Sequence, residues 1–236
     1  MVTQLVCILA LLITVASSNA VAIRGGVATT SASHPYYVSI QDSDGTHVCG
    51  GALISKDVVA TAASCLADYV VSELVVHVGS GNSIPIAISK FDSAYDFVTN
   101  ENDVGLLKLA QPIVLSSTVG IISVASSQPT TGASGVVVGY DTNNKLVEIP
   151  VSVISSADCA SGKYKYNEDE VFNSEVCALA TTNDACDAEP GSPLVSNNQL
   201  IGLVSWGYGC ANKGNPTVYT NIATLNSWIS TSSKSL

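Results

Sequence analysis

The apolar residues of this chain come in short runs that turn residues separate, a pattern typical of β-strands. Val, Ile and Tyr dominate the runs, and Gly, Asn, Asp, Ser and Pro lie between them. The runs read YYVSI, GALIS, VVATAA, ELVVHVG, IPIAIS, VGLLKLA, GVVVGY, VEIPVSVI, LIGLVSW and TVYTNI. Many short strands at near-regular spacing are typical of a β-barrel or a β-sandwich, so the pattern predicts an all-β fold.

Two segments depart from this pattern and predict helix. Residues 155–162 (SSADCASG) are typical of a short capped turn, and residues 223–231 (ATLNSWIST) place Leu225, Trp228 and Ile229 on one helical face. The best linker is residues 126–134, which are polar and uncharged and contain Pro and Gly.

The N-terminus predicts a signal peptide over residues 1–22 and therefore a secreted, extracellular protein. An apolar run from Leu5 to Val15 precedes small residues, and this run is too short to span a bilayer. Cleavage after Ala20 or after Ala22 satisfies the small-x-small rule, and the sequence leaves both open. No second long apolar stretch follows, so we expect no membrane association.

Net charge and cysteine content indicate which classes of partner and cofactor to expect. The formal net charge of −10 argues against nucleic acid, which needs Lys and Arg patches, and leaves either basic protein partners or mere solubility. Cys7 lies in the signal peptide, and the other six cysteines predict three disulfides in a secreted chain: Cys49, Cys65, Cys159, Cys177, Cys186 and Cys210. Without a CxxC pair or a His cluster, we expect no metal and no cofactor.

Six ordered motifs resemble those of the trypsin-like serine proteases over nearly the whole of residues 23–236. They are IRGG at 23, CGGALIS at 49, TAASC at 61, NDVGLLKL at 102, CDAEPGSPLV at 186 and VSWGYGC at 204. The resemblance implies two antiparallel six-stranded β-barrels, about residues 23–125 and 126–236, and a C-terminal α-helix. It also implies the disulfides Cys49–Cys65, Cys159–Cys177 and Cys186–Cys210.

The catalytic positions that the resemblance implies depart from the family pattern. Acyl transfer by a triad needs a serine hydroxyl, an imidazole base and a carboxylate that orients the imidazole. Ser64 occupies the histidine position in TAASC, Pro190 occupies the nucleophile position in AEPGSP, and Asp103 remains as the carboxylate. Proline also lacks the backbone N–H that this position contributes to the oxyanion hole. The loss of one such donor costs about 3–4 kcal/mol of transition-state stabilisation.

Other residues are weak substitutes for the missing groups. Ser192 would need a two-residue shift to act as nucleophile, and we expect none of His34, His47 and His77 to act as base. His47 resembles a structural histidine behind the active-site loop, His77 lies in a strand and His34 in a turn. Asp103 is either a relic with a binding role or a buried carboxylate that backbone N–H groups and Ser205 satisfy.

The specificity pocket that the resemblance implies is also modified. Asp184 is at the position of the acid that binds Arg or Lys, and Ser205, Trp206 and Gly207 form a wall. Thr217 stands where the family usually has glycine, so its side chain is expected to fill part of the pocket.

Activation and calcium binding differ from the family as well. Ile23 follows Ala22 rather than a basic residue, so only signal cleavage after Ala22 would free its amine to pair with Glu189. The stretch that corresponds to the calcium loop, residues 78–91, has no carboxylate, so we expect no calcium there.

These features together predict a secreted, non-catalytic serine protease homologue that is not an enzyme and acts by protein binding. The expected partner is an extracellular protease, inhibitor or protein substrate, and the protein would act as cofactor, decoy or regulator of proteolysis, immunity or reproduction. The alternatives are a weak hydrolase with a non-standard site and a secreted storage or structural protein. The oligomeric state does not follow from the sequence.

Overall fold

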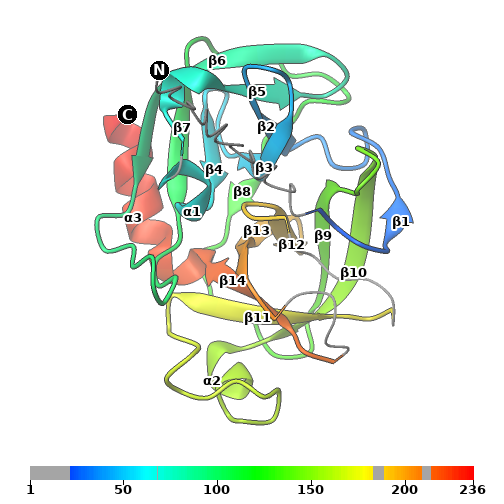
Figure 1. The fold of residues 1–236 in the computed structure, drawn as a ribbon, viewed down its shortest axis with the longest axis vertical. Coiled ribbons are helices and arrows are strands. Elements are labelled where there is room, and N and C mark those ends of the chain that lie inside the picture. The colour runs from blue at the N-terminus through cyan, green and yellow to red at the C-terminus, as the bar shows by residue number, and fades with distance from the viewer. Residues whose placement is uncertain (1–21, 68, 183–188, 209–213) are drawn as a thin grey trace, which may run out of the picture.

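A computed structural model describes residues 22–67, 69–182, 189–208 and 214–236. Short strands dominate it, as the apolar runs predict, and a long helix ends the chain (Figure 1). In chain order the elements are β1 (Val27–Ala28), β2 (Tyr37–Asp42), β3 (His47–Leu53), β4 (Val58–Thr61), α1 (Ser64–Ala67), η1 (Val71–Glu73), β5 (Leu74–Val78), β6 (Asn82–Phe91), β7 (Gly105–Leu109), β8 (Ser123–Val124), β9 (Ser134–Tyr140), β10 (Leu146–Ile154), α2 (Ser156–Cys159), β11 (Glu175–Ala180), β12 (Pro193–Ser196), β13 (Gln199–Trp206), β14 (Thr217–Asn221) and α3 (Ile222–Ser235).

The strands form two closed antiparallel barrels of six strands each, which confirms the predicted fold class. The first barrel runs β2-β3-β4-β7-β6-β5. The second runs β9-β10-β11-β14-β13-β12 and closes through the pairings of β9 with β10 and with β12. The short strands β1 and β8 add to the second sheet by pairing with β10 and β13.

Alternation of side chains explains why these segments form barrels. Along β5, Leu74, Val76 and Val78 are buried and the residues between them are partly exposed, which is the period of two of a strand with one face in a core. In β10 the same alternation buries Val147, Ile149 and Val151. Each barrel therefore encloses its own apolar core.

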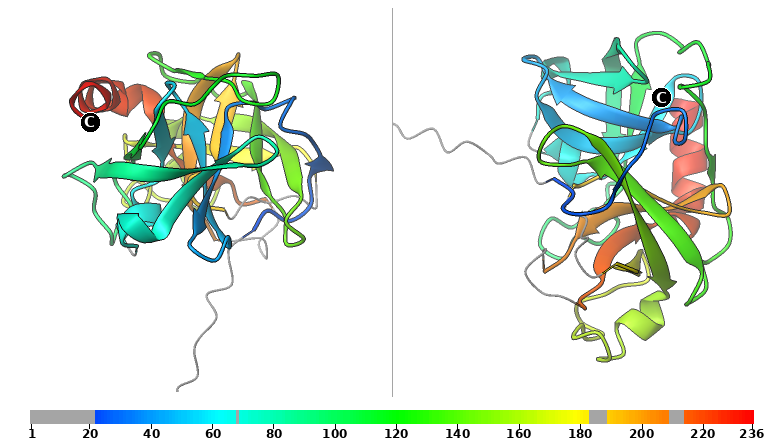
Figure 2. Two further views of the ribbon diagram at one scale, coloured as in Figure 1. Left: turned by 90° about the horizontal axis from the view of Figure 1, so that it is seen from above. Right: turned by 90° about the vertical axis from the view of Figure 1, so that its right-hand side faces the viewer.

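A third apolar cluster joins the two barrels. Val58 and Leu106 of the first barrel pack in one cluster with Val138 and Leu203 of the second. Helix α3 adds its apolar face there through three side chains, Ile222, Leu225 and Ile229, and runs back along the first barrel (Figure 2). The predicted helical face is confirmed, and Trp228 packs against the same cluster. The barrels are thus held against each other, and loops from both meet at their junction.

Candidate active site

Three loops at the junction of the barrels carry the triad positions. Ser64 begins α1 directly after β4, Asp103 precedes β7, and Pro190 lies in the turn before β12. The first two come from the first barrel and the third from the second. The fold therefore places these positions where both barrels contribute to one site.

Asp103 is a buried carboxylate with several donors. It is 1% exposed, and its Oδ1 accepts from the Ser64 backbone N–H at 2.8 Å. Its Oδ2 accepts from Ser64 Oγ at 3.0 Å and from Ser205 Oγ at 2.5 Å. Burial raises the pKa of Asp103, and the donors from Ser205 and Ser64 oppose that rise. The site thus holds a carboxylate that is a stronger base than an exposed one, in contact with the hydroxyl of Ser64, a partly exposed residue.

The structure fixes Pro190 through its neighbours. The carbonyl oxygen of Pro190 accepts from Gly50 N at 3.0 Å, and Gly191 N donates to Val204 O at 2.8 Å. Gly191 has a φ of +78°, and a Cβ there would lie 2.3 Å from Gly50 O, so only glycine fits. Pro190 supplies neither a hydroxyl nor an N–H to the site.

Ser192 is not available to substrate, although it is two residues past Pro190. It is 0% exposed, and its Oγ has no hydrogen-bond partner among the residues that the structure describes. Cβ atoms added at Gly50 or Gly139 would each lie 2.7 Å from that oxygen, so backbone packs on both sides of it. The hydroxyl therefore faces the interior behind the loop.

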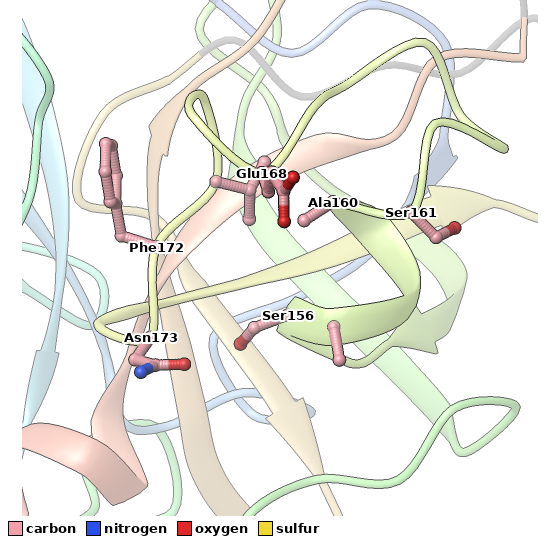
Figure 3. A pocket seen from close by; sticks show the side chains of 8 residues that line it. Ser156, Ala160, Ser161, Glu168, Phe172 and Asn173 are labelled. Atoms are coloured by element: carbon pink, nitrogen blue, oxygen red, sulfur yellow. The ribbon is translucent and has the colours of Figure 1, made fainter.

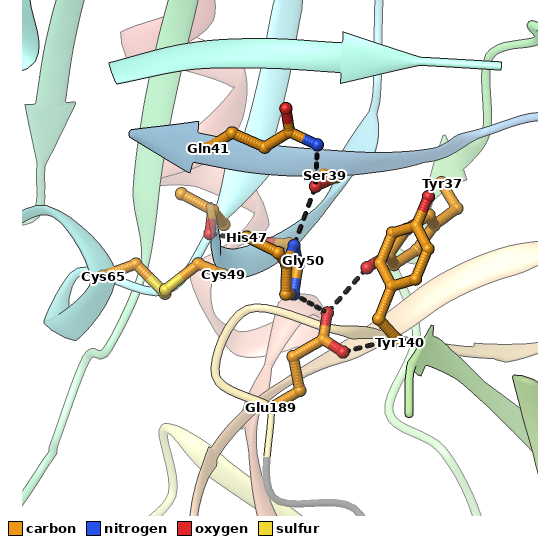
Figure 4. Close-up of polar contacts among 10 residues, drawn as sticks. Tyr37, Ser39, Gln41, His47, Cys49, Gly50, Cys65, Tyr140 and Glu189 are labelled. Atoms are coloured by element: carbon orange, nitrogen blue, oxygen red, sulfur yellow. Dashed lines mark hydrogen bonds and ion pairs between the residues drawn. A yellow bond between two sulfur atoms is a disulfide. The ribbon is translucent and has the colours of Figure 1, made fainter. Parts of the chain in front are cut away.

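Glu189 anchors the loop from the inside (Figure 4). Its carboxylate is fully buried and accepts from Tyr37 Oη at 2.6 Å and from Tyr140 N at 2.5 Å. His47 Nε2 lies 3.0 Å from Oε1 without hydrogen-bond geometry, and Ser39 Oγ lies 2.7 Å from His47 Nδ1. Sequence reasoning placed His47 behind the loop, and it lies there. It missed Tyr37, because Tyr37 is the first residue of an apolar strand, and nothing in the local sequence indicates that its hydroxyl donates to a glutamate far along the chain.

The predicted partner of Glu189, Ile23, lies beside it without pairing. The Ile23 side chain is fully buried, and its backbone N donates to Tyr140 O at 2.9 Å. The two carboxylate oxygens of Glu189 are occupied by the groups just described. In this structure, in which Ala22 precedes Ile23, the loop is held by Tyr37, Tyr140 and His47 instead.

Two of the pocket positions that the resemblance implies face each other. Gly207 faces Thr217, since a Cβ added at Gly207 would lie 3.6 Å from Thr217 Cα and 3.9 Å from its Cγ2. Trp206 Nε1 donates to Glu175 Oε1 at 2.7 Å. Asp184 lies outside the described residues. Sequence reasoning missed Glu175, whose signal was an acidic residue at the start of an apolar strand.

Two disulfides lie within the described residues and match the predicted pairing. Cys49–Cys65 joins β3 to α1, and Cys159–Cys177 joins α2 to β11. Cys186 and Cys210 lie outside the described residues. Among those residues, no group of three or more His, Cys, Asp and Glu could hold a metal ion. Nor does that part of the chain contain a helix long and apolar enough to cross a membrane.

Comparison with known proteins identifies the family. The model of the family described as Trypsin matches residues 23–229. A trypsin of Sarcophaga bullata is 39% identical over 229 residues, which cover 91% of this chain and 90% of that protein. Trypsin theta of Drosophila melanogaster is 38% identical with 91% and 87% covered, and trypsin alpha of the same species is 37% identical with 91% and 88% covered. The two-barrel fold and these matches together show that the chain belongs to the trypsin family of serine proteases.

The comparisons correct the prediction that this chain is not an enzyme. Relatives that match nine-tenths of the chain carry the names of trypsins, which points to a protease rather than a non-catalytic regulator. The prediction rested on two substituted positions, Ser64 and Pro190. Those substitutions remove the imidazole base and the serine nucleophile of the family route, but they leave open a route in which a hydroxyl is paired directly with the carboxylate. The contact between Ser64 and Asp103 is such a pair.

Proposed function

We propose that this protein is a secreted hydrolase of the trypsin family that acts on polypeptides through a non-standard pair, Ser64 and Asp103. The observation that carries the proposal is the 3.0 Å hydrogen bond from Ser64 Oγ to Asp103 Oδ2. The family assignment supports the reaction class, and the partial exposure of Ser64 supports its access to substrate.

The proposed reaction is acyl transfer through Ser64. Its Oγ attacks the carbonyl carbon while its proton passes to Asp103, whose raised pKa makes it a better acceptor. The leaving amine or alcohol takes that proton as the acyl–oxygen bond to Ser64 forms and the scissile bond breaks. Water then attacks the ester carbonyl carbon and gives a proton to Asp103. Asp103 returns that proton to Ser64 Oγ as the acyl–oxygen bond breaks and the acid is released.

Ester hydrolysis by purified protein tests this proposal. We expect turnover above the buffer rate for the wild type, and a fall of about 100-fold for Asp103→Asn, the size of a general-base contribution. Ser64→Ala, purified in parallel, is expected to fall to the buffer rate. Ser192→Ala is the matched control and is expected to keep the wild-type rate, since its hydroxyl is buried away from the site.

Two outcomes would reject the proposal. One is a wild-type rate equal to that of buffer, and the other is full activity in Ser64→Ala. Loss of activity in Ser192→Ala alone would transfer the role to Ser192.

We further propose secretion and a protein partner in the extracellular space, either a protein substrate, a protease or an inhibitor. The short apolar N-terminal run supports export, and the two disulfides are stable in an oxidising compartment. Intact mass of the protein from culture medium checks export and distinguishes cleavage after Ala20 from cleavage after Ala22. Retention of the full-length chain in the cell would contradict it.

A further inference from the structure

Glu175 is a buried carboxylate that the proposed reaction does not use. It opens β11 and is 0% exposed. Its Oε1 accepts from Trp206 Nε1 at 2.7 Å, and its Oε2 accepts from Phe172 N at 2.8 Å. One side chain therefore ties β13 of the second barrel to the turn before β11.

Trp206 is fixed from several sides. Beyond the bond to Glu175, its ring meets Tyr166 edge-on with centroids 5.4 Å apart and Tyr208 with centroids 6.3 Å apart. The indole remains partly exposed, next to Ser205, which contacts Asp103. Trp206 thus forms a surface beside the candidate active site, and Glu175 holds its polar edge.

The other donor to Glu175 belongs to a turn beside a surface hollow. Phe172 and Asn173 line this hollow of about 420 Å³ together with Ser156 and Glu168 (Figure 3). The backbone N–H of Phe172 points to Glu175 rather than to solvent. The same carboxylate therefore fixes the turn on one side and the tryptophan on the other.

We propose that Glu175 is a positioning residue whose charge state decides whether Trp206 and the Phe172 turn are both held in place. An ionised carboxylate has two acceptor oxygens, one for each donor. A protonated carboxyl keeps one carbonyl oxygen as a good acceptor, but its hydroxyl oxygen is a weaker acceptor and carries a hydrogen that neither facing N–H can take. Protonation therefore weakens the hold on either the indole or the Phe172 amide.

The electrostatic surroundings place this change near neutral pH. Burial raises the pKa of Glu175 to about 7; the donors from Trp206 and Phe172 oppose the rise, and Glu101 and Asp103 add to it. Because the pKa in the folded protein lies above the ordinary value of 4.5, the folded state binds the extra proton between about pH 4.5 and 7. Folding stability therefore falls as pH rises through that window, and the protonation itself does not unfold the protein.

The other titratable groups beside Trp206, Tyr208 and Glu170, change charge at pH values away from neutral. Tyr208 donates to Glu170 at 2.6 Å, which lowers the pKa of Glu170 and raises that of Tyr208. Neither group then changes charge near pH 7. A polypeptide that lies along Trp206 is expected to bind more tightly above pH 7 than below it. This consequence rests on the proposed function, whereas the charge state of Glu175 does not.

Tryptophan fluorescence tests the proposal without any turnover. The chain has two tryptophans, so Trp228→Phe leaves Trp206 as the only one. We expect its emission maximum to shift between pH 5.5 and 9 with one midpoint near 7. Adding Glu175→Gln is expected to abolish the shift and give the low-pH emission at every pH, because the amide offers one acceptor oxygen.

Two further variants separate the sources of the signal. In the Trp228→Phe background, Glu170→Gln is expected to keep the shift. Asp103→Asn is expected to keep it with a lower midpoint, because the negative charge of Asp103 near Glu175 is removed.

An emission that does not change with pH in the folded Trp228→Phe protein would overturn the proposal. So would a shift that persists with Glu175→Gln. If Glu175→Gln does not fold, as judged by circular dichroism, the Asp103→Asn midpoint still decides: an unchanged midpoint overturns the proposal. Failure of ester hydrolysis affects none of these results.

Discussion

At the scale of single residues, the site is organised by buried carboxylates, each with its own set of donors. Asp103 accepts from two serines, Glu189 from one tyrosine hydroxyl and one backbone amide, and Glu175 from an indole and a backbone amide. Buried charge is tolerated only when it is hydrogen-bonded, so removal of one donor is costly. Each donor is therefore a point at which a substitution has a measurable effect.

Tyr37→Phe is expected to destabilise the fold. It removes the 2.6 Å donor to fully buried Glu189, and burial together with that carboxylate raises the pKa of Tyr37, so the phenol stays neutral and donating. Loss of a hydrogen bond to a buried charge costs about 1.5–3 kcal/mol, measured as the free energy of unfolding in urea. Tyr164→Phe, which has no such bond, is the control and is expected to change stability by less than about 0.5 kcal/mol. Equal stability of the two variants would contradict the assigned role of Tyr37.

At the scale of elements, a side-chain pair ties the segment after β1 to β10. His34 Nε2 lies 2.5 Å from Glu148 Oε2, and Thr29 Oγ1 donates to the same oxygen at 3.0 Å. β1 pairs with β10 through residues 27 and 28, and Thr29 N donates to Leu146 O at 3.0 Å, so these side chains add to a short backbone attachment. The attachment of the N-terminal segment is therefore sensitive to the charge of Glu148.

In Glu148→Gln, the free energy of unfolding is expected to fall less steeply between pH 6 and pH 3 than in the wild type. The hydrogen bond from His34 lowers the pKa of Glu148, and that from Thr29 acts in the same direction. A lowered pKa means that Glu148 contributes stability above its ordinary value of 4.5 and loses it as pH falls through the folded value. Urea midpoints between pH 6 and 3 check this. Glu168→Gln, on an exposed loop, serves as the control. If stability falls equally with pH in Glu148→Gln and in the wild type, Glu148 does not have the assigned role.

At the scale of the whole molecule, two closed barrels and a shared apolar cluster build a trypsin fold around altered triad positions. The scaffold keeps Asp103 buried and the Pro190 backbone bonded to Gly50 despite the changed side chains. Since nucleophile and base act as a unit, their effects on rate are far from additive. Restoring both is therefore the informative change.

The double variant Ser64→His with Pro190→Ser is expected to hydrolyse esters about 1,000-fold faster than either single variant. It supplies an imidazole next to Asp103, a hydroxyl opposite and a backbone N–H that Pro190 lacks. Initial rates on one ester substrate check the ratio, with Ser192→Ala in the double variant as the control. A double variant no faster than the singles would show that the loop is not aligned for the family mechanism.

How far the sequence predicts the molecule depends on whether a feature is local. The apolar runs located most strands, but β11 (EVCALA) was not among them, because it begins with the charged Glu175 and is poor in Val and Ile. Two disulfide pairs followed from the resemblance and are confirmed. The prediction of a non-enzyme was wrong, because it rested on the side chains at two triad positions and took no account of a direct contact between Ser64 and Asp103.

The sequence by itself determined the all-β class, the family and the residues at the triad positions, because strand periodicity and ordered motifs are properties of neighbouring residues. Only the tertiary structure decided that Ser192 is buried, that Glu189 is held by Tyr37 and His47, and that Glu175 supports Trp206. These contacts join residues that lie 152, 142 and 31 positions apart in the chain. The physical reason is that closure of the barrels decides which donors lie within hydrogen-bond distance of each buried carboxylate, and these donors cannot be identified from the residues next to it in the sequence.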